Sequence, residues 1–189
     1  MQLNFKRMVL ALAAVVLFGG GSIFASPPPP SPDTSAYLSG RASTLLAEVQ
    51  DEAAGLTFHA ETLWTFSGDP KYSWRSHAFH LDKVKGHINA VSERTAELQR
   101  ISYAALPWQQ KAITELTAHA MQVAASTQAA IVHLNGNQDR LMIPEYREHL
   151  TTIADRSADM KQSVDKFLDY EKAQQKFQQL QTDLELSGD

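Results

Sequence analysis

Histidine is the residue type in this chain with the widest chemical use, and the chain contains seven. His59, His77 and His80 lie near one another in the sequence, and His149 lies much later. Imidazole nitrogens bind transition metals and haem iron. If the fold brought these four side chains to one end of the molecule, they would form a metal or haem site. The remaining histidines are His87, His119 and His133.

The same histidines also fit a purely structural role. Helical bundles that hold two iron ions carry Glu-x-x-His on two helices, and that pattern does not occur in this sequence. His119 and His149 each follow a glutamate by four residues, which is the spacing of ordinary pairs on a helix surface. An inward histidine can be satisfied by a carboxylate or a carbonyl group. The sequence leaves both interpretations open.

Motifs for catalysis are missing from the chain. It has no cysteine, which excludes disulfides, a thiol nucleophile and cysteine-based metal motifs. It also has no Gly-x-Ser-x-Gly elbow, no His-Glu-x-x-His helix and, beyond the leader, no glycine-rich phosphate loop. We therefore expect the protein not to be an enzyme and to need no cofactor, unless the histidines hold a metal or haem.

A group of aromatic residues surrounds the expected junction of the first two helices. Such side chains could line a ligand pocket, or they could close the open end of a helical bundle. The group consists of Phe58, Trp64, Phe66, Tyr72, Trp74 and Phe79.

The N-terminal 25 residues have the three zones of a secretory signal. Lys6 and Arg7 precede an uncharged run over 8–18, and Ala25 provides a small residue for cleavage. The apolar run is short for a membrane span, although an uncleaved anchor is the alternative. A Pro-rich linker over 26–33 follows. The sequence thus predicts a periplasmic or secreted protein, with membrane contact only through an uncleaved signal.

Charge limits the partners of the exported part. Without Lys6 and Arg7, 15 basic residues face 21 acidic ones, which gives a formal charge of −6. No cluster of basic residues offsets this charge, so nucleic acid is not an expected partner. We expect an unknown protein or cell-envelope component instead.

The elements that must position these side chains are helices. Apolar residues recur every three or four positions in four segments, and no strand-like alternation competes with this period. Pro70, Pro107 and Pro144 mark helix starts, because proline is tolerated in the first helical turn. The predicted fold is all-α, an antiparallel up-down-up-down four-helix bundle over 34–181 with a flexible tail over 182–189. The segments are 34–66, 71–102, 107–135 and 144–181.

The region of the last three predicted helices also carries a family resemblance. The stretches that carry it are Trp74-Arg75-Ser76-His77, His87-Ile88-Asn89, Pro107-Trp108-Gln109-Gln110 and Pro144-Glu145-Tyr146-Arg147. Over about 71–172 the chain resembles a group of uncharacterised exported bacterial four-helix-bundle proteins. The resemblance implies the fold and export, and it implies no activity.

These observations give two functional hypotheses. The first is a non-enzymatic exported bundle of the cell envelope that acts as a binding or interaction module. The alternative is a bundle that binds a transition metal or haem through His59, His77, His80 and His149.

Overall fold

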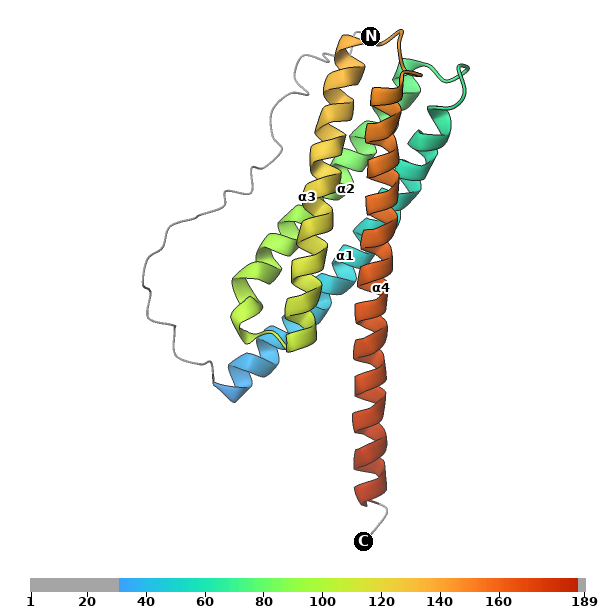
Figure 1. The fold of residues 1–189 in the computed structure, drawn as a ribbon. Helices are drawn as coiled ribbons and strands as arrows, with labels where there is room; N and C mark the ends of the chain where they lie inside the picture. Colours follow the sequence, from blue (N-terminus) through green and yellow to red (C-terminus); the bar gives the residue numbers. More distant parts are fainter. Residues whose placement is uncertain (1–30, 187–189) are drawn as a thin grey trace, which may run out of the picture.

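Four long helices make up nearly all of the computed structural model, which describes residues 31–186. The helices pack against one another along their lengths (Figure 1). No strand occurs in the described range, so the all-α prediction is confirmed. The helices are α1 (Pro32–Phe66), α2 (Trp74–Ile101), α3 (Pro107–Gly136) and α4 (Pro144–Leu186), with a 3-10 turn, η2 (Ser102–Ala104), after α2.

Local signals explain where most helices begin. The Ser31 hydroxyl accepts the Thr34 amide at 3.3 Å and caps α1, so this helix starts two residues before the predicted bound. Pro107 and Pro144 open α3 and α4 as expected. Pro70 does not open α2, because it lies within the turn that precedes Trp74. The start predicted at residue 71 is therefore wrong by three residues.

The core consists of the apolar stripes that the sequence pattern indicates. Each helix buries its stripe of small and branched side chains mainly against its two neighbours, α1 and α3 each packing against both α2 and α4. Four polar residues are buried with this core: His77, Thr95, Thr127 and Ser157. His59 is only partly buried, at the edge between α1 and α2.

Helix α4 is longer than predicted. It continues to Leu186, so residues 182–186 are helical where the sequence suggested a frayed tail. This end of α4 projects beyond the other three helices (Figure 1). The side chains over 172–185 are all exposed. The projecting part, 172–186, is called the α4 arm below.

The predicted signal peptide over 1–25 and the linker up to Pro30 lie outside the described residues. Within residues 31–186, no helix combines the length and the apolar character that a membrane span requires. The described range contains all four helices and the core they bury, so a fragment over 26–189 keeps every contact discussed below.

Candidate functional site

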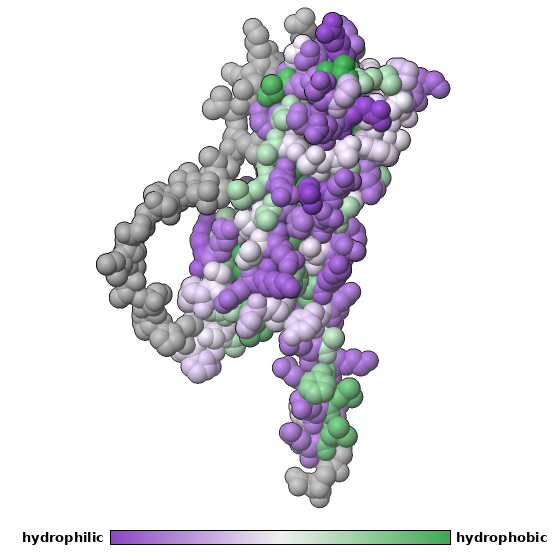
Figure 2. All heavy atoms as spheres, viewed as in Figure 1, coloured by the Kyte–Doolittle hydropathy of each residue, from purple (hydrophilic) through white to green (hydrophobic). Residues whose placement is uncertain are grey.

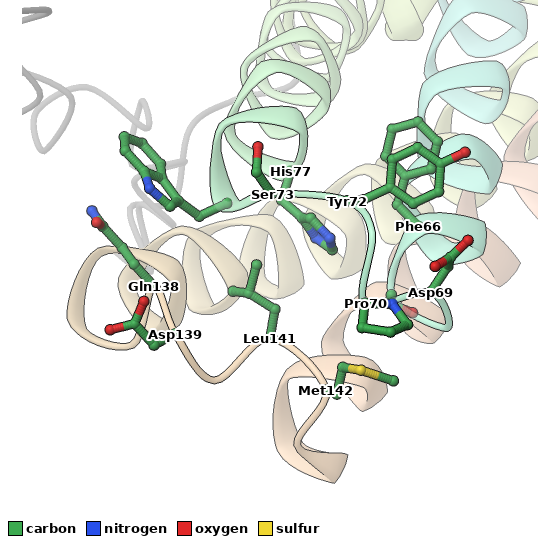
Figure 3. Close-up of a pocket in the computed structure, with 12 residues that line it drawn as sticks. Phe66, Asp69, Pro70, Tyr72, Ser73, His77, Gln138, Asp139, Leu141 and Met142 are labelled. Atoms are coloured by element: carbon green, nitrogen blue, oxygen red, sulfur yellow. The ribbon is translucent and has the colours of Figure 1, made fainter.

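A pocket of about 360 Å³ opens at one end of the bundle. Two loops form it, the one between α1 and α2 and the one between α3 and α4 (Figure 3). Segments about 70 residues apart in the sequence therefore share one site, which we call the loop-end pocket. Its lining residues are Phe66, Ser67, Asp69, Pro70, Tyr72, Ser73, Trp74, His77, Gln138, Asp139, Leu141 and Met142.

Aromatic and aliphatic side chains form most of the pocket wall. The rings of Phe66 and Tyr72 stack, with centroids 3.7 Å apart and planes at 11°. Leu141 and Met142 come from the other loop, and Figure 3 shows both beside the pocket. Met142 is 49% exposed, so it contributes to an accessible wall rather than filling a gap in the core.

Two carboxylates give the pocket a negative rim. Asp69 belongs to the first loop and Asp139 to the second. The Asp69 carboxylate accepts the backbone amide of Lys71 at 2.9 Å, which fixes its direction and shapes the turn. With apolar walls and acidic edges, the pocket suits a side chain that has an aliphatic stem and a positive end.

His77 is one of the polar residues that line the pocket, and it is only 1% exposed. Its Nδ1 lies 3.1 Å from the hydroxyl oxygen of Tyr146, which is fully buried on α4. Burial, with a smaller contribution from His80, lowers the pKa of His77 to about 4, and burial raises the pKa of Tyr146. Both groups are thus neutral near pH 7, and their hydrogen bond joins α2 to α4 beneath the pocket.

Helix α3 supports this pair through His133. Its ring stacks on Tyr146 with centroids 4.9 Å apart, and its Nε2 lies 3.3 Å from the carbonyl oxygen of Arg140. Three helices therefore fix the orientation of Tyr146, and through it that of His77. The sequence placed His133 at the end of a helix but gave no sign that it would meet Tyr146.

A second group of histidines lies between α1 and α2, outside the pocket. The Nδ1 atoms of His59 and His80 are 3.1 Å apart, so a single proton can join them. The His59 ring also stacks on His87 with centroids 5.6 Å apart. His87 in turn donates from Nδ1 to Glu52 at 2.8 Å. Burial lowers the pKa of His59 and of His80, and the neighbouring His80, His87 and Lys83 lower that of His59 further.

Gly55 makes the close approach of His87 to α1 possible. A Cβ atom at position 55 would lie 2.5 Å from Cε1 of His87 and 2.7 Å from its Nε2. Real contacts of this kind are longer, so any larger residue would displace the ring. Glycine in mid-helix costs about 1 kcal/mol relative to alanine, and here that cost makes room for the imidazole.

Charged residues continue this row along the α1–α2 face. Arg94 contacts Glu48 at 3.1 Å and Glu52 at 3.6 Å, and Arg41 contacts Glu97 at 2.9 Å. All of these side chains are partly exposed, so each pair contributes less than about 1 kcal/mol. Their shared effect is to set the lengthwise position of α2 against α1.

The structure does not assemble the predicted four-histidine site. His59 and His80 meet, whereas His77 turns to Tyr146, and His149 is not among the residues that contact either group. Within residues 31–186, no three histidine, aspartate or glutamate side chains are arranged to hold one metal ion. The reason is the environment of each ring: His77 is 1% exposed and packs against Tyr146 of α4, whereas His80 lies at the partly exposed edge where α2 meets α1.

The aromatic group separates in a similar way. Phe66, Tyr72 and Trp74 line the pocket. Phe58 and Phe79 are exposed and instead meet the edges of His59 and His80, at centroid distances of 5.1 Å. Sequence reasoning missed pocket residues in both loops: Ser67, Asp69, Pro70 and Ser73 in the first, and Gln138, Asp139, Leu141 and Met142 in the second. Loop composition alone gave no sign of their role.

Comparison with known proteins adds nothing to the description of the loop-end pocket or of the histidines between α1 and α2. No protein-family model, curated protein or solved structure matches this chain.

Proposed function

We propose that the protein is a non-enzymatic, exported binding module of the cell envelope, and that its loop-end pocket holds a lysine or arginine side chain of a partner protein. The observation that carries this proposal is the combination of stacked rings and two carboxylates around one accessible hollow. Phe66 and Tyr72 offer a flat apolar surface with Asp69 beside it, and Asp139 lies on the opposite side of the pocket (Figure 3).

The chemistry of a basic side chain matches these features one by one. Its methylene stem packs on aromatic and thioether surfaces while the charged end stays near water and acceptors. A cation close to an aromatic face gains a further 0.5–1 kcal/mol or so at exposed sites. The negative charge of the exported part, −6 by sequence, favours approach of a basic partner.

The buried groups below the pocket support binding rather than catalysis. His77 and Tyr146 bond to each other and are neutral near pH 7. This pair offers a ligand a fixed, uncharged hydrogen-bonding group, and neither member is activated as a nucleophile.

Long-range contacts support the antiparallel up-down-up-down arrangement that we propose for the bundle. Arg41 of α1 contacts Glu97 of α2, and His59 contacts His80. The residue numbers of the contacting pairs thus increase along α1 while they decrease along α2, as they do between two antiparallel helices. Export rests on the Lys6-Arg7 leader and its apolar run. The resemblance to exported bacterial bundles stays a prediction.

Nuclear magnetic resonance of the fragment over 26–189 tests the pocket directly. The probes are N-acetylated, C-amidated tripeptides Ala-Lys-Ala and Ala-Arg-Ala, with Ala-Glu-Ala as the matched control. We expect millimolar binding, with amide shifts over 67–73 and 137–143 and none from the glutamate peptide. Asp139→Asn should weaken binding without loss of stability, because Asp139 is exposed. Shifts elsewhere, or equal shifts from all three peptides, would contradict the proposal.

A second candidate function, transition-metal binding, is favoured by one distance. Two nitrogen ligands at about 2.0–2.1 Å on a tetrahedral ion lie about 3.3 Å apart. The Nδ1 atoms of His59 and His80 are 3.1 Å apart. The donor set is neutral imidazole, which suits zinc and copper, and Glu52 orients the neighbouring His87. This site is smaller than the one predicted from sequence, because His77 and His149 do not belong to it.

Thermal unfolding with and without added zinc or copper tests this candidate. A metal that binds only the folded state raises the melting temperature, and the rise grows with the logarithm of its concentration over the Kd. We expect an increase that His59→Gln and His80→Gln abolish and that His119→Gln, on α3, leaves intact. An increase that survives both substitutions would place the metal elsewhere. No increase would remove the candidate and leave the pair as a structural contact.

A further inference from the structure

The α4 arm exposes a row of large apolar side chains. Tyr170, at the base of the arm, is 48% exposed, Phe177 62%, Leu180 51% and Leu184 74%. Figure 2 shows hydrophobic residues gathered along this projecting end of the molecule. Scattered apolar residues on a surface need no explanation, but four on one short helix form a patch.

These residues follow a coiled-coil repeat. Tyr170, Phe177 and Leu184 are seven positions apart, and Ala173 and Leu180 each follow a member of that series by three. The two sets are the a and d positions of a heptad, which form a single stripe on one side of a helix. Tyr170 contacts Trp108, with ring centroids 6.0 Å apart, so the stripe begins at the bundle itself.

An isolated helix of this length is only marginally stable in water. The arm is connected to the bundle through α4, which supplies the first turns, but no other helix of the described chain covers its outer part. A partner that packs on the stripe would remove its apolar surface from water and hold the arm helical.

We propose that the partner is a second copy of this chain, with two arms packed antiparallel. In this register Phe177 faces Leu180 of the second copy, and Ala173 faces Leu184. Twofold symmetry repeats each contact, since the same patch serves both chains. The alternation of large and small side chains lets the two helices approach closely.

Charge complementarity selects the antiparallel direction. In that arrangement g positions meet g positions, so Lys176 lies beside Asp183 of the second copy, twice per dimer. The e positions, Gln174 and Gln181, meet each other and can exchange hydrogen bonds. A parallel pair would place Lys176 beside Gln181 and form no ion pair.

The arm is poorly suited to a lipid surface. Residues 172–186 contain two basic and two acidic side chains, whereas helices that lie on anionic membranes are rich in lysine and arginine. The similar content of both signs instead fits pairing with a copy of the same segment.

Sedimentation velocity of the fragment over 26–189, from about 1 to 500 μM, tests the association. We expect a concentration-dependent dimer. Phe177→Glu should weaken it at least thirtyfold, because the charge would be buried at the centre of the interface. The matched control is Gln175→Glu, which adds the same charge on the outward side of the arm and should leave the dimer unchanged. Both positions are exposed in the single chain, so folding is not at risk.

A charge exchange tests the register. Lys176→Glu alone and Asp183→Lys alone should each weaken the dimer about tenfold, since each creates two like-charged contacts. The double variant should restore it, because the pairs reform with exchanged signs. Failure of the double variant to recover would overturn the antiparallel register.

Spin labels at single cysteines measure the direction, since the chain has no cysteine of its own. In the antiparallel dimer two labels at position 179 lie at the same level, whereas two at position 172 lie about 20 Å apart along the axis. Equal short separations at both positions would mean a parallel dimer and overturn the proposal. A monomer at every concentration would also overturn it, as would Phe177-dependent binding to lipid vesicles without a dimer.

Discussion

Replacing Gly55 by alanine tests whether the row of histidines between α1 and α2 is packed as the structure describes. In an open helix the exchange of glycine for alanine stabilises by about 1 kcal/mol. At position 55 the added methyl group would lie 2.5 Å from Cε1 of His87. The ring must therefore move, and its hydrogen bond to Glu52 and its stack on His59 are lost.

The net effect follows from comparing these terms. The charge-assisted contact of a partly buried imidazole and the ring packing together contribute about 2 kcal/mol. Subtracting the gain in helix propensity leaves a net decrease of about 1 kcal/mol in the free energy of unfolding. For a chain of this size that corresponds to a fall of about 2–4 °C in melting temperature.

Two other glycines supply matched controls. A Cβ at Gly40 on α1 or at Gly86 on α2 would meet nothing within 4 Å. Alanine at either position should therefore stabilise by about 0.5–1 kcal/mol. Urea unfolding of the three variants at pH 8, followed by circular dichroism, gives the free energies of unfolding.

A second substitution isolates the contact. Once His87→Ala has removed the ring, the effect of Gly55→Ala on the free energy of unfolding should change sign and become stabilising, like that of Gly40→Ala. The difference gives an interaction energy of about 2 kcal/mol between positions 55 and 87. If Gly55→Ala stabilises while His87 is present, the close approach of that ring to α1 is wrong. The neighbouring placement of His59 would then also lose its support.

Three further predictions follow. The pKa of His77 is lowered to about 4, so stability should be full above the unfolded value of 6.5 and fall by up to about 3 kcal/mol as pH drops toward 4. Urea midpoints of wild type and His77→Gln between pH 4 and 8 measure this. Equal dependence of the two midpoints on pH would contradict a buried neutral imidazole. The hydroxyl of Thr127 is buried with no hydrogen-bond partner in residues 31–186, so Thr127→Val should raise the free energy of unfolding by about 1 kcal/mol, and a decrease would reveal an unseen partner. Intact mass of the protein from the cell envelope should begin at or near Ser26, whereas a full-length species would mean a retained anchor.

The helices could be read from the sequence because their signals are local. A period of three to four residues and a proline in the first turn act within a few positions, and they set α1, α3 and the start of α4. Where a signal was misplaced, the cause was also local. Pro70 serves the loop beneath the stacked rings of Phe66 and Tyr72, and α2 begins only at Trp74. Only residues 182–186 of α4 were assigned to the tail, although Leu184 keeps the seven-residue spacing of Tyr170 and Phe177.

The candidate sites depend on how the helices are rotated and shifted against one another, which no single segment encodes. His77 turns inward to Tyr146 of α4, whereas His80 of the same helix meets His59 of α1. His149, three positions after the buried Tyr146, is only partly buried. The pocket needs two loops about 70 residues apart to meet at one end of the bundle. Local signals in the sequence therefore determined the four helices and most of their bounds. Which histidines and which loops meet was decided only by the packing of the whole core.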